Sequence, residues 1–126
     1  MARTQAVTVE TLERVLDAFN RHDLDAIMTF FADDASFDTP RGADPWGSRH
    51  EGSAAVRKGL AARFEGIPDV HYSEPRHWVC GEHGVSEWLL TGTTTAGERI
   101  AVRGCDHWRF RDGLIVRKDS YWKIVG

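Results

Sequence analysis

The first half of the chain has the hydrophobic spacing of helices. From Val9 onward, apolar side chains recur every three or four residues and form one helical face at Leu12, Val15, Leu16 and Phe19. Thr8 is a suitable N-cap for this helix. A second, short helix is predicted after Asp23, with apolar positions at Leu24, Ile27, Met28 and Phe31. A third is predicted with Ser53 as its cap and an apolar stripe at Val56, Leu60 and Phe64.

The second half changes to the pattern of strands. Four strand-like segments are separated by short turn sequences and cover residues 69–80, 84–95, 99–111 and 114–125. They predict an antiparallel meander. A shorter strand over 35–39 ends at Pro40, and the Gly- and Pro-containing stretch 40–52 is expected to be a loop. Helices followed by hairpins predict one α+β domain over residues 1–126, in which helices pack on one face of a curved sheet. Such a sheet would enclose a single ligand-sized pocket.

Composition and charge exclude several classes of protein. The chain has 126 residues, of which 41% are hydrophobic, so one domain with a real core is expected. A net charge of −3 argues against binding to nucleic acid through phosphate neutralisation. No apolar run is long enough to cross a bilayer, and the first six residues lack the pattern of a signal peptide. We therefore expect a soluble cytoplasmic protein in which Cys80 and Cys105 are reduced.

One carboxylate falls where strand alternation predicts the core. In the segment 99–111, every second residue belongs to a mostly apolar set formed by Ile100, Val102, Gly104, Asp106, Trp108 and Phe110. A carboxylate there loses its hydration, which is costly unless the group is paired or protonated. A carboxyl that keeps its proton would suit a general acid or a donor to a developing oxyanion. The alternative is that a neighbouring His, Tyr or backbone N–H satisfies Asp106, with no chemistry.

The same residues carry a resemblance to a known family. Residues 106–110, Asp-His-Trp-Arg-Phe, with the turn and strand that follow, resemble the Asp-His-Phe-Arg-Phe hairpin of bacterial ketosteroid isomerases. Further matching segments occur in the same order and comprise Phe19-Asn20, Asp23-Leu24-Asp25, residues 31–35, Pro40 with Gly42, and residues 52–57. The chain is thus similar over nearly its whole length to the nuclear transport factor 2-like (NTF2-like) superfamily, and within it to the SnoaL-like branch of polyketide cyclases and isomerase-related proteins. The resemblance implies a cone-shaped fold, three N-terminal helices packed on a strongly curved, mostly antiparallel sheet, and homodimers formed through that sheet.

The catalytic residues of ketosteroid isomerases match only in part. Those enzymes use a carboxylate base and an oxyanion hole made of a tyrosine and a protonated aspartic acid. Asp106 matches the aspartic acid, but Val15 stands at the tyrosine position and Thr39 at that of the base. Asp38 is adjacent, yet one residue along a strand points to the opposite face. Steroid isomerisation by that mechanism is therefore not expected. SnoaL-like cyclases, by resemblance, use an aspartate in the cone as general acid/base for an aldol ring closure, a role that Asp106 fits.

Other polar residues have alternative interpretations. Lys118 has the strand parity of Ser120 and Trp122, and if it points inward it would pair with Asp106 and keep the carboxylate ionised as a base. An outward, solvated Lys118 is slightly favoured, because the opposite parity of this strand is equally mixed. Asp119 is the alternative carboxylate if the register differs.

Histidines give a weaker signal. His71 could face the cavity, as the catalytic histidines of the superfamily's dehydratases do, but the first helix offers no matching carboxylate partner. The six histidines form no spaced metal motif, and no Gly-rich phosphate loop occurs, so no metal or cofactor is expected. Trp46 and His50 lie on the loop 40–52, which is either a lid over the mouth of the cone or a mobile surface loop.

These observations favour a cofactor-free enzyme of cyclase or isomerase type that acts on an apolar, carbonyl-containing small molecule. Asp106 would be its general acid/base. The expected pocket is formed by Val15, Phe19, Phe37, Thr39, Trp46, Phe64, Trp88, Trp108, Ser120 and Trp122. The alternative is a non-catalytic binding or scaffold module. A third possibility, an epoxide hydrolase or dehydratase, needs two more polar groups converging on Asp106.

Overall fold

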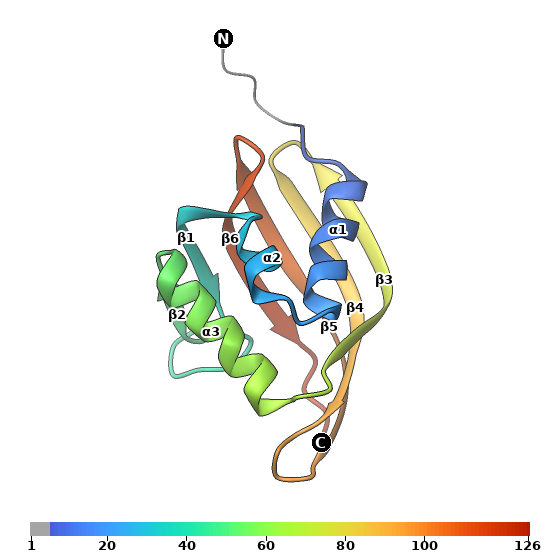
Figure 1. The fold of residues 1–126 in the computed structure, drawn as a ribbon. Helices are drawn as coiled ribbons and strands as arrows, with labels where there is room; N and C mark the ends of the chain where they lie inside the picture. The colour runs from blue at the N-terminus through green and yellow to red at the C-terminus, as the bar shows by residue number, and fades with distance from the viewer. Residues whose placement is uncertain (1–5) are drawn as a thin grey trace.

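Three helices lie against one side of a single curved sheet in the computed structural model, which describes residues 6–126 (Figure 1). The helices are α1 (Val9–Asn20), α2 (Leu24–Met28) and α3 (Ser53–Gly66). The strands are β1 (Phe31–Asp38), β2 (Arg49–Glu51), β3 (His71–Cys80), β4 (His83–Thr93), β5 (Arg99–Arg111) and β6 (Leu114–Trp122). The expected α+β class is confirmed. Residues 1–5, where no signal peptide is expected, lie outside the described residues.

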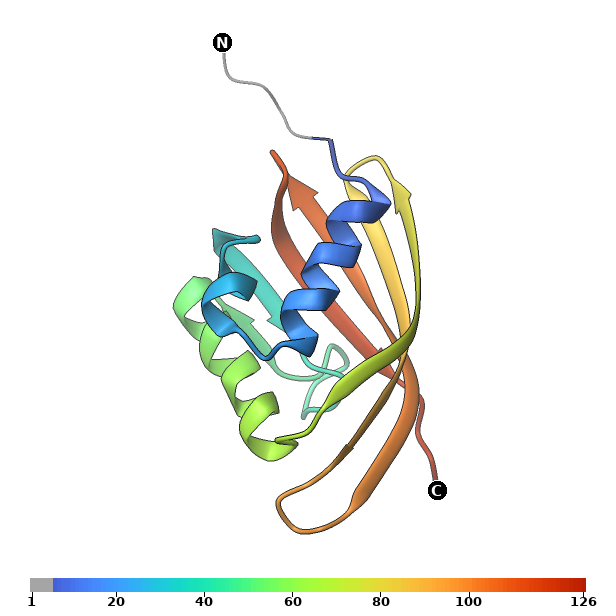
Figure 2. The same cartoon turned by 45° about the vertical axis from the view of Figure 1, so that its right-hand side comes forward.

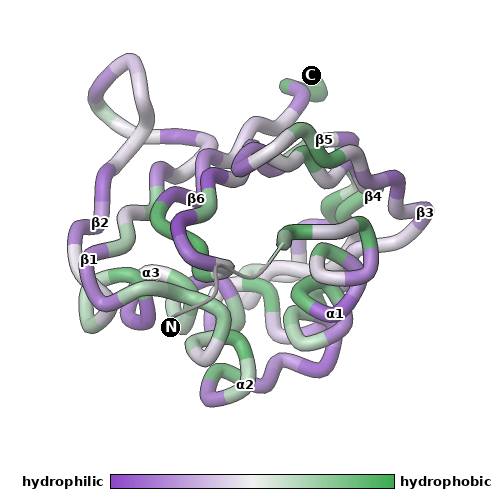
Figure 3. The backbone as a smooth tube through the Cα atoms, turned by 90° about the horizontal axis from the view of Figure 1, so that it is seen from above, coloured by the Kyte–Doolittle hydropathy of each residue, from purple (hydrophilic) through white to green (hydrophobic). Residues whose placement is uncertain are grey.

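The sheet has the strand order β2-β1-β6-β5-β4-β3. Strands β3 to β6 form the expected antiparallel meander, whereas β1 pairs in parallel with β6 and antiparallel with β2. Seen from above, β4, β5 and β6 lie opposite the helices, so the backbone surrounds an interior (Figure 3). Turned by 45°, the same fold shows α1 lying across the concave side of the sheet while the β4–β5 hairpin extends past the end of α3 (Figure 2).

The helix starts follow the capping rules at two of three positions. Thr8 caps α1 in a reciprocal capping box with Thr11, and the Asp23 side chain accepts a hydrogen bond from the Ala26 N–H at the start of α2. Ser53, the expected cap of α3, is instead its first residue. The N-cap is Gly52, whose φ of 87° suits glycine because no Cβ is present to clash.

Every strand except β5 differs from its predicted bounds, β3 and β4 by only one or two residues at their ends. β1 begins at Phe31, before the predicted segment 35–39, because Phe31 already pairs with Ile115 of β6. The predicted loop 40–52 contains the short strand β2, which pairs with the end of β1. β6 ends at Trp122, before the end of the predicted segment.

The core lies between the concave face of the sheet and the apolar faces of the helices. Its largest fully buried side chains include Trp88, Trp108, Phe110, Leu12 and Ile27. The buried set also contains five polar or charged residues, namely Asp38, Ser86, Asp106, Lys118 and Ser120. Cys80 and Cys105 are free thiols, as expected. Within residues 6–126, no helix is long and apolar enough to span a membrane.

Candidate active site

Asp106 is buried at the centre of a polar cluster. It lies on β5 and is 2% exposed, with the inward direction that strand alternation predicts. Its Oδ1 atom accepts hydrogen bonds from Lys118 Nζ at 2.5 Å and from Ser120 Oγ at 2.5 Å. Its Oδ2 atom accepts one from the indole Nε1 of Trp88 at 3.1 Å. Three donors therefore converge on this carboxylate, which is the arrangement that an ionised carboxylate needs when water is excluded.

Lys118 points inward, so the slightly favoured outward orientation is wrong. Its side chain is 4% exposed, and its Nζ also lies 2.7 Å from Ser120 Oγ. The cause is a bulge in the β5–β6 ladder, where Arg109 pairs with Arg117 but the next residue, Phe110, pairs with Ile115. Val116 is the extra residue in this ladder. Because of it, the inward-facing positions are Ile115 before the bulge and Lys118 after it.

Aromatic rings surround the Lys118 ammonium. Its Nζ lies 4.8 Å from the ring centroid of Phe37 and 5.4 Å from those of Phe19 and Trp108, distances at which cation–π attraction operates. Burial lowers the pKa of Lys118 below its ordinary value, and the nearby Asp106 carboxylate opposes that shift. The amine is therefore easier to deprotonate than a surface lysine.

A glycine on β5 allows Trp88 to reach the carboxylate. Gly104 pairs directly with Trp88 across the β4–β5 ladder. A Cβ atom at Gly104 would come within 2.7 Å of the Trp88 ring and 2.4 Å of the Tyr121 carbonyl oxygen. The indole can approach this strand so closely only because residue 104 has no side chain.

The buried Ser86 and the half-buried His77 extend the cluster across the sheet. Ser86 is directly opposite Asp106 in the β4–β5 ladder, and its Oγ accepts a hydrogen bond from Trp108 Nε1 at 3.0 Å. His77 on β3 is opposite Ser86, with its Nδ1 2.8 Å from the Ser86 Oγ. The His77 Nε2 atom is buried without a hydrogen-bond partner among the described residues, and burial lowers the pKa of this imidazole.

Sequence reasoning missed Ser86 and His77. A signal for Ser86 exists, because it alternates with Trp88 and Leu90 at the inward positions of β4. No such signal exists for His77, since β3 is bulged between Ser73 and Arg76 and its alternation is interrupted there.

Seven of the ten expected pocket residues surround the polar cluster or pack beside it. Val15, Phe19, Phe37, Trp88 and Trp108 are at most 3% exposed, while Phe64 and Trp122 are partly buried against the same core. Ser120 belongs to the cluster itself. The Arg63 guanidinium of α3 lies 4.3 Å from the ring centroid of Trp122.

The other two expected pocket residues, Thr39 and Trp46, lie at the surface beside loop 40–52. Together with Ser120 and residues near them they line a cavity of about 340 Å³. The Thr39 hydroxyl donates to the Arg41 carbonyl oxygen at 2.7 Å, and Trp46 is 45% exposed. This cavity borders Ser120, the neighbour of Asp106.

Three of the other candidate catalytic residues lie away from the cluster. Asp38 is fully buried but binds Arg49 and Arg117, each at 2.8 Å, on the other side of β1. Burial alone would raise the pKa of Asp38, but the two guanidinium groups outweigh it and hold this pKa below its ordinary value. His71 is exposed, and the partly exposed Asp119 accepts a hydrogen bond from the Tyr121 hydroxyl at 3.1 Å. None of the three is placed to act with Asp106.

The cluster is closed to solvent in this structure. Asp106, Lys118 and Ser120 are 2%, 4% and 5% exposed. A ligand can therefore reach the carboxylate only when side chains above it move. Among residues 6–126, no group of three or more His, Cys, Asp or Glu side chains is arranged to hold a metal ion.

Comparisons with known proteins give one family and one fold. Residues 12–118 match a sequence-family model described as a SnoaL-like domain. The chain is similar to a proposed polyketide cyclase of Xanthomonas campestris pv. campestris, with 22% identity, a TM-score of 0.80, and 90% of this chain and 88% of that one covered. It is also similar to a proposed polyketide cyclase of Pseudomonas putida (17% identity, TM-score 0.81, 91% and 90% covered). A proposed isomerase of Bacillus subtilis matches with 21% identity and a TM-score of 0.76 over 90% and 84% of the two chains. At these identities the likeness shows a shared fold.

Proposed function

The chain belongs to the SnoaL-like domain family, and from this premise we propose that it is an enzyme of cyclase or isomerase type that acts on an apolar carbonyl compound. The substrate would bind inside the cone, and Asp106 would transfer protons to and from the carbon next to the carbonyl group. The observation that carries this proposal is the buried carboxylate, amine and hydroxyl in direct contact among aromatic side chains.

The cluster supplies both halves of such a reaction. A carboxylate paired with an ammonium group is ionised, so Asp106 would begin as a base that removes the α-proton. The negative charge then develops on the substrate's carbonyl oxygen. Lys118 and Ser120 lie within hydrogen-bond distance of the same carboxylate oxygen, so they are the donors available to stabilise the enolate. Because water is excluded, their electrostatic effect is larger than at the surface.

The surroundings favour a flat, apolar substrate. Phe19, Phe37 and Trp108 provide ring faces around the polar centre. The comparison structures described as proposed polyketide cyclases and a proposed isomerase support the same class of chemistry.

A binding experiment tests whether the interior is a working pocket. The unmodified protein, Asp106→Asn and Asp119→Asn are screened by thermal shift against planar aromatic ketones and phenols. Asp119 is the matched control, because it is a partly exposed carboxylate on the outer side of β6. We expect ligands that stabilise the unmodified protein and Asp119→Asn alike, with an affinity for Asp106→Asn that differs by about tenfold or more, or about 1.4 kcal/mol. If nothing binds and Asp106→Asn changes only the melting temperature, the proposal fails.

A non-catalytic binding or scaffold module is the second candidate. Both oxygens of Asp106 already have protein donors and the interior is packed, as a purely structural polar cluster requires. The two candidates differ in whether a bound ketone exchanges its α-protons.

An epoxide hydrolase or dehydratase would find its additional polar groups in Lys118 and Ser120. The histidine expected for a dehydratase, His71, is exposed instead.

We also propose that two copies pair through the outer face of the sheet. That face carries a groove of about 760 Å³ lined by residues of β3, β4, β5 and β6 and by Lys123, among them Pro75, Cys105, Tyr121 and Trp122. Tyr121 is 56% exposed in the single chain, and an exposed aromatic ring beside a groove is typical of a protein interface.

A further inference from the structure

We propose that Lys118 is an amine nucleophile, whose Nζ condenses with the carbonyl carbon of the bound compound to form an iminium ion. The iminium would then serve as the electron sink for proton removal at the α-carbon. This inference rests on the proposed function, because it requires an apolar carbonyl compound to enter the interior. It assigns the substrate class more narrowly, to ketones and aldehydes that can form an imine.

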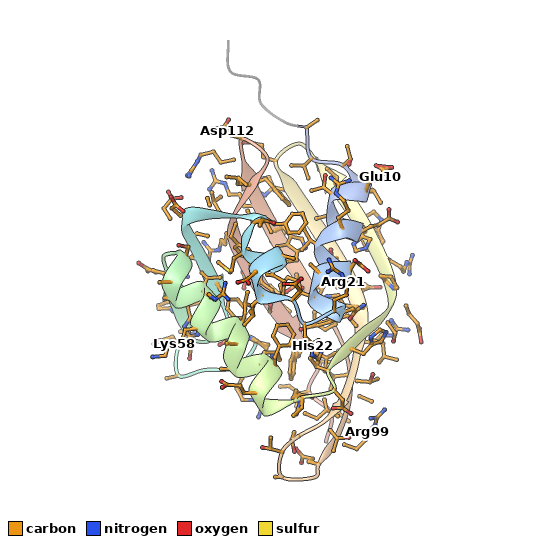
Figure 4. All side chains as sticks on the ribbon, in the orientation of Figure 1. Glu10, Arg21, His22, Lys58, Arg99 and Asp112 are labelled. Carbon is orange, nitrogen blue, oxygen red and sulfur yellow. The ribbon has the colours of Figure 1, made fainter. Side chains whose placement is uncertain are left out.

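Lys118 differs from the other lysines of the chain by its burial. The sequence contains three lysines, Lys58, Lys118 and Lys123. Lys58 and Lys123 are exposed, and Lys58 points away from the fold on the outer side of α3 (Figure 4). Lys118 alone is enclosed, with its Nζ within 5.4 Å of three ring centroids. Amines become nucleophiles in such apolar sites because burial disfavours the ammonium form.

The pair with Asp106 provides the deprotonated amine without a change in net charge. The Nζ···Oδ1 distance of 2.5 Å allows one proton to pass between the two groups. The pair is neutral overall both as ammonium with carboxylate and as amine with carboxylic acid. Entry of an apolar ligand beside the pair would favour the second form, since it leaves no separated charges in an apolar medium. Burial already lowers the pKa of Lys118.

The condensation of the amine with the carbonyl compound uses only groups present in the cluster. The Lys118 nitrogen forms a bond to the carbonyl carbon, and the nitrogen's proton moves to the former carbonyl oxygen, giving a neutral carbinolamine. Asp106, now a carboxylic acid, protonates the carbinolamine hydroxyl, which leaves as water. An iminium paired with the Asp106 carboxylate remains.

Asp106 is then the base for the carbon chemistry. Its carboxylate removes the α-proton, and the electron pair of the C–H bond moves into the iminium to give a neutral enamine. Reprotonation at another carbon, or attack of the enamine on a second carbonyl carbon, corresponds to isomerisation or ring closure. Addition of water to the resulting iminium releases the product and restores the amine. Ser120, which contacts both Lys118 Nζ and Asp106 Oδ1, is placed to pass protons between them.

Reductive trapping tests the inference on the intact protein. The protein is incubated with 4-phenylbutan-2-one and sodium cyanoborohydride, which reduces an imine to a stable secondary amine. Intact-mass analysis and peptide mapping then give the extent of labelling at Lys58, Lys118 and Lys123. We expect labelling of Lys118 that saturates with ketone concentration and exceeds that of either exposed lysine several-fold, because burial disfavours the ammonium form and so raises the fraction of free amine. In guanidinium chloride, where the fold is lost, the three lysines should react alike.

Variants provide the controls. Lys58→Arg/Lys123→Arg leaves Lys118 as the only lysine and should be labelled there at the unmodified rate. Adding Lys118→Arg, which keeps the charge but forms no reducible imine, should abolish labelling except at the amino terminus. Asp106→Asn should slow labelling by about a hundredfold, the scale of a lost general acid.

The outcomes separate this inference from the proposed function. Lys118 is not a nucleophile if 4-phenylbutan-2-one raises the melting temperature of the unmodified protein but labels only the exposed lysines or the amino terminus. The proposed function would then stand with Lys118 as a hydrogen-bond donor. If none of the ketones, 4-phenylbutan-2-one included, either stabilises the protein or labels Lys118, both proposals are wrong.

Discussion

Lys118 Nζ lies 2.5 Å from Asp106 Oδ1 in the interior, with each side chain at most 4% exposed. The two residues come from adjacent strands, and a bulge at Val116 is what turns the lysine inward to meet the carboxylate. Each charge is stable in the core only because the other is present. The ion pair therefore affects the stability of the fold as well as the chemistry of the site.

Removing one partner of this pair should lower the free energy of unfolding more than removing both. Lys118→Met leaves an unpaired buried carboxylate and is expected to lower the free energy of unfolding by about 3–5 kcal/mol. Asp106→Asn/Lys118→Met replaces both charges and should recover most of that loss. A double-mutant cycle tests this: denaturant titrations give the free energy of unfolding of the unmodified protein, the two single variants and the double variant. A Lys118→Met variant within about 0.5 kcal/mol of the unmodified protein would show that the pair does not exist in solution.

The position of Trp88 depends on the missing side chain at residue 104. Gly104→Ala should lower the free energy of unfolding by about 1–3 kcal/mol, because the new Cβ collides with the Trp88 ring and the Tyr121 carbonyl oxygen. Gly66→Ala is the control, since a Cβ there meets nothing within 4 Å. Equal effects of the two substitutions on the unfolding midpoint would refute the close approach of Trp88 to β5.

His77 should make the protein less stable in mild acid. Burial lowers the pKa of His77 from 6.5, while Glu13 on α1 opposes that shift. As the pH falls below 6.5, the unfolded chain takes up a proton on this residue before the folded chain does, so the free energy of unfolding falls. Well above pH 6.5 both states are neutral at this residue and the effect vanishes. His77→Gln should show a smaller loss of stability between pH 7.5 and pH 5.5 in urea titrations. An identical loss in both proteins would contradict the lowered pKa of the half-buried His77.

The outer face of the sheet should control the oligomeric state. We expect light scattering to give twice the chain mass of 14.2 kDa for the unmodified protein. Tyr121→Arg places a charge beside the outer groove and should shift the population toward the single chain. Leu114→Arg, at the exposed first position of β6 and outside the groove, should leave the mass unchanged. A single-chain mass for the unmodified protein at high concentration would remove this proposal.

The order of elements and the burial of Asp106 could be predicted because both depend on regular spacing. β5 has uninterrupted alternation from Arg99 to Arg111, so the side on which Asp106 lies follows from counting. The three helices carry their apolar residues at helical spacing, and the starts of the first two are marked by Thr8 and Asp23.

The partners of Asp106 could not be predicted in the same way, because they depend on irregularities. The bulge at Val116 reverses the parity of β6, so counting from either end gives Lys118 a different direction. His77 follows a bulge in β3 for the same reason. The contact between Trp88 and Asp106 depends on how an indole rotates over Gly104, which no periodicity encodes.

The central claim is that Asp106 transfers protons at the carbon next to a carbonyl group, and hydrogen–deuterium exchange measures this directly. A planar ketone that binds in the thermal-shift screen, such as 2-tetralone, is incubated in D₂O, and the loss of its α-proton signal is followed by NMR. We predict that the unmodified protein and Asp119→Asn accelerate the exchange above buffer, and that Asp106→Asn is slower by about a hundredfold or more. Equal exchange rates for Asp106→Asn and the unmodified protein, or no acceleration of any ketone that binds, would contradict the account and leave a binding module.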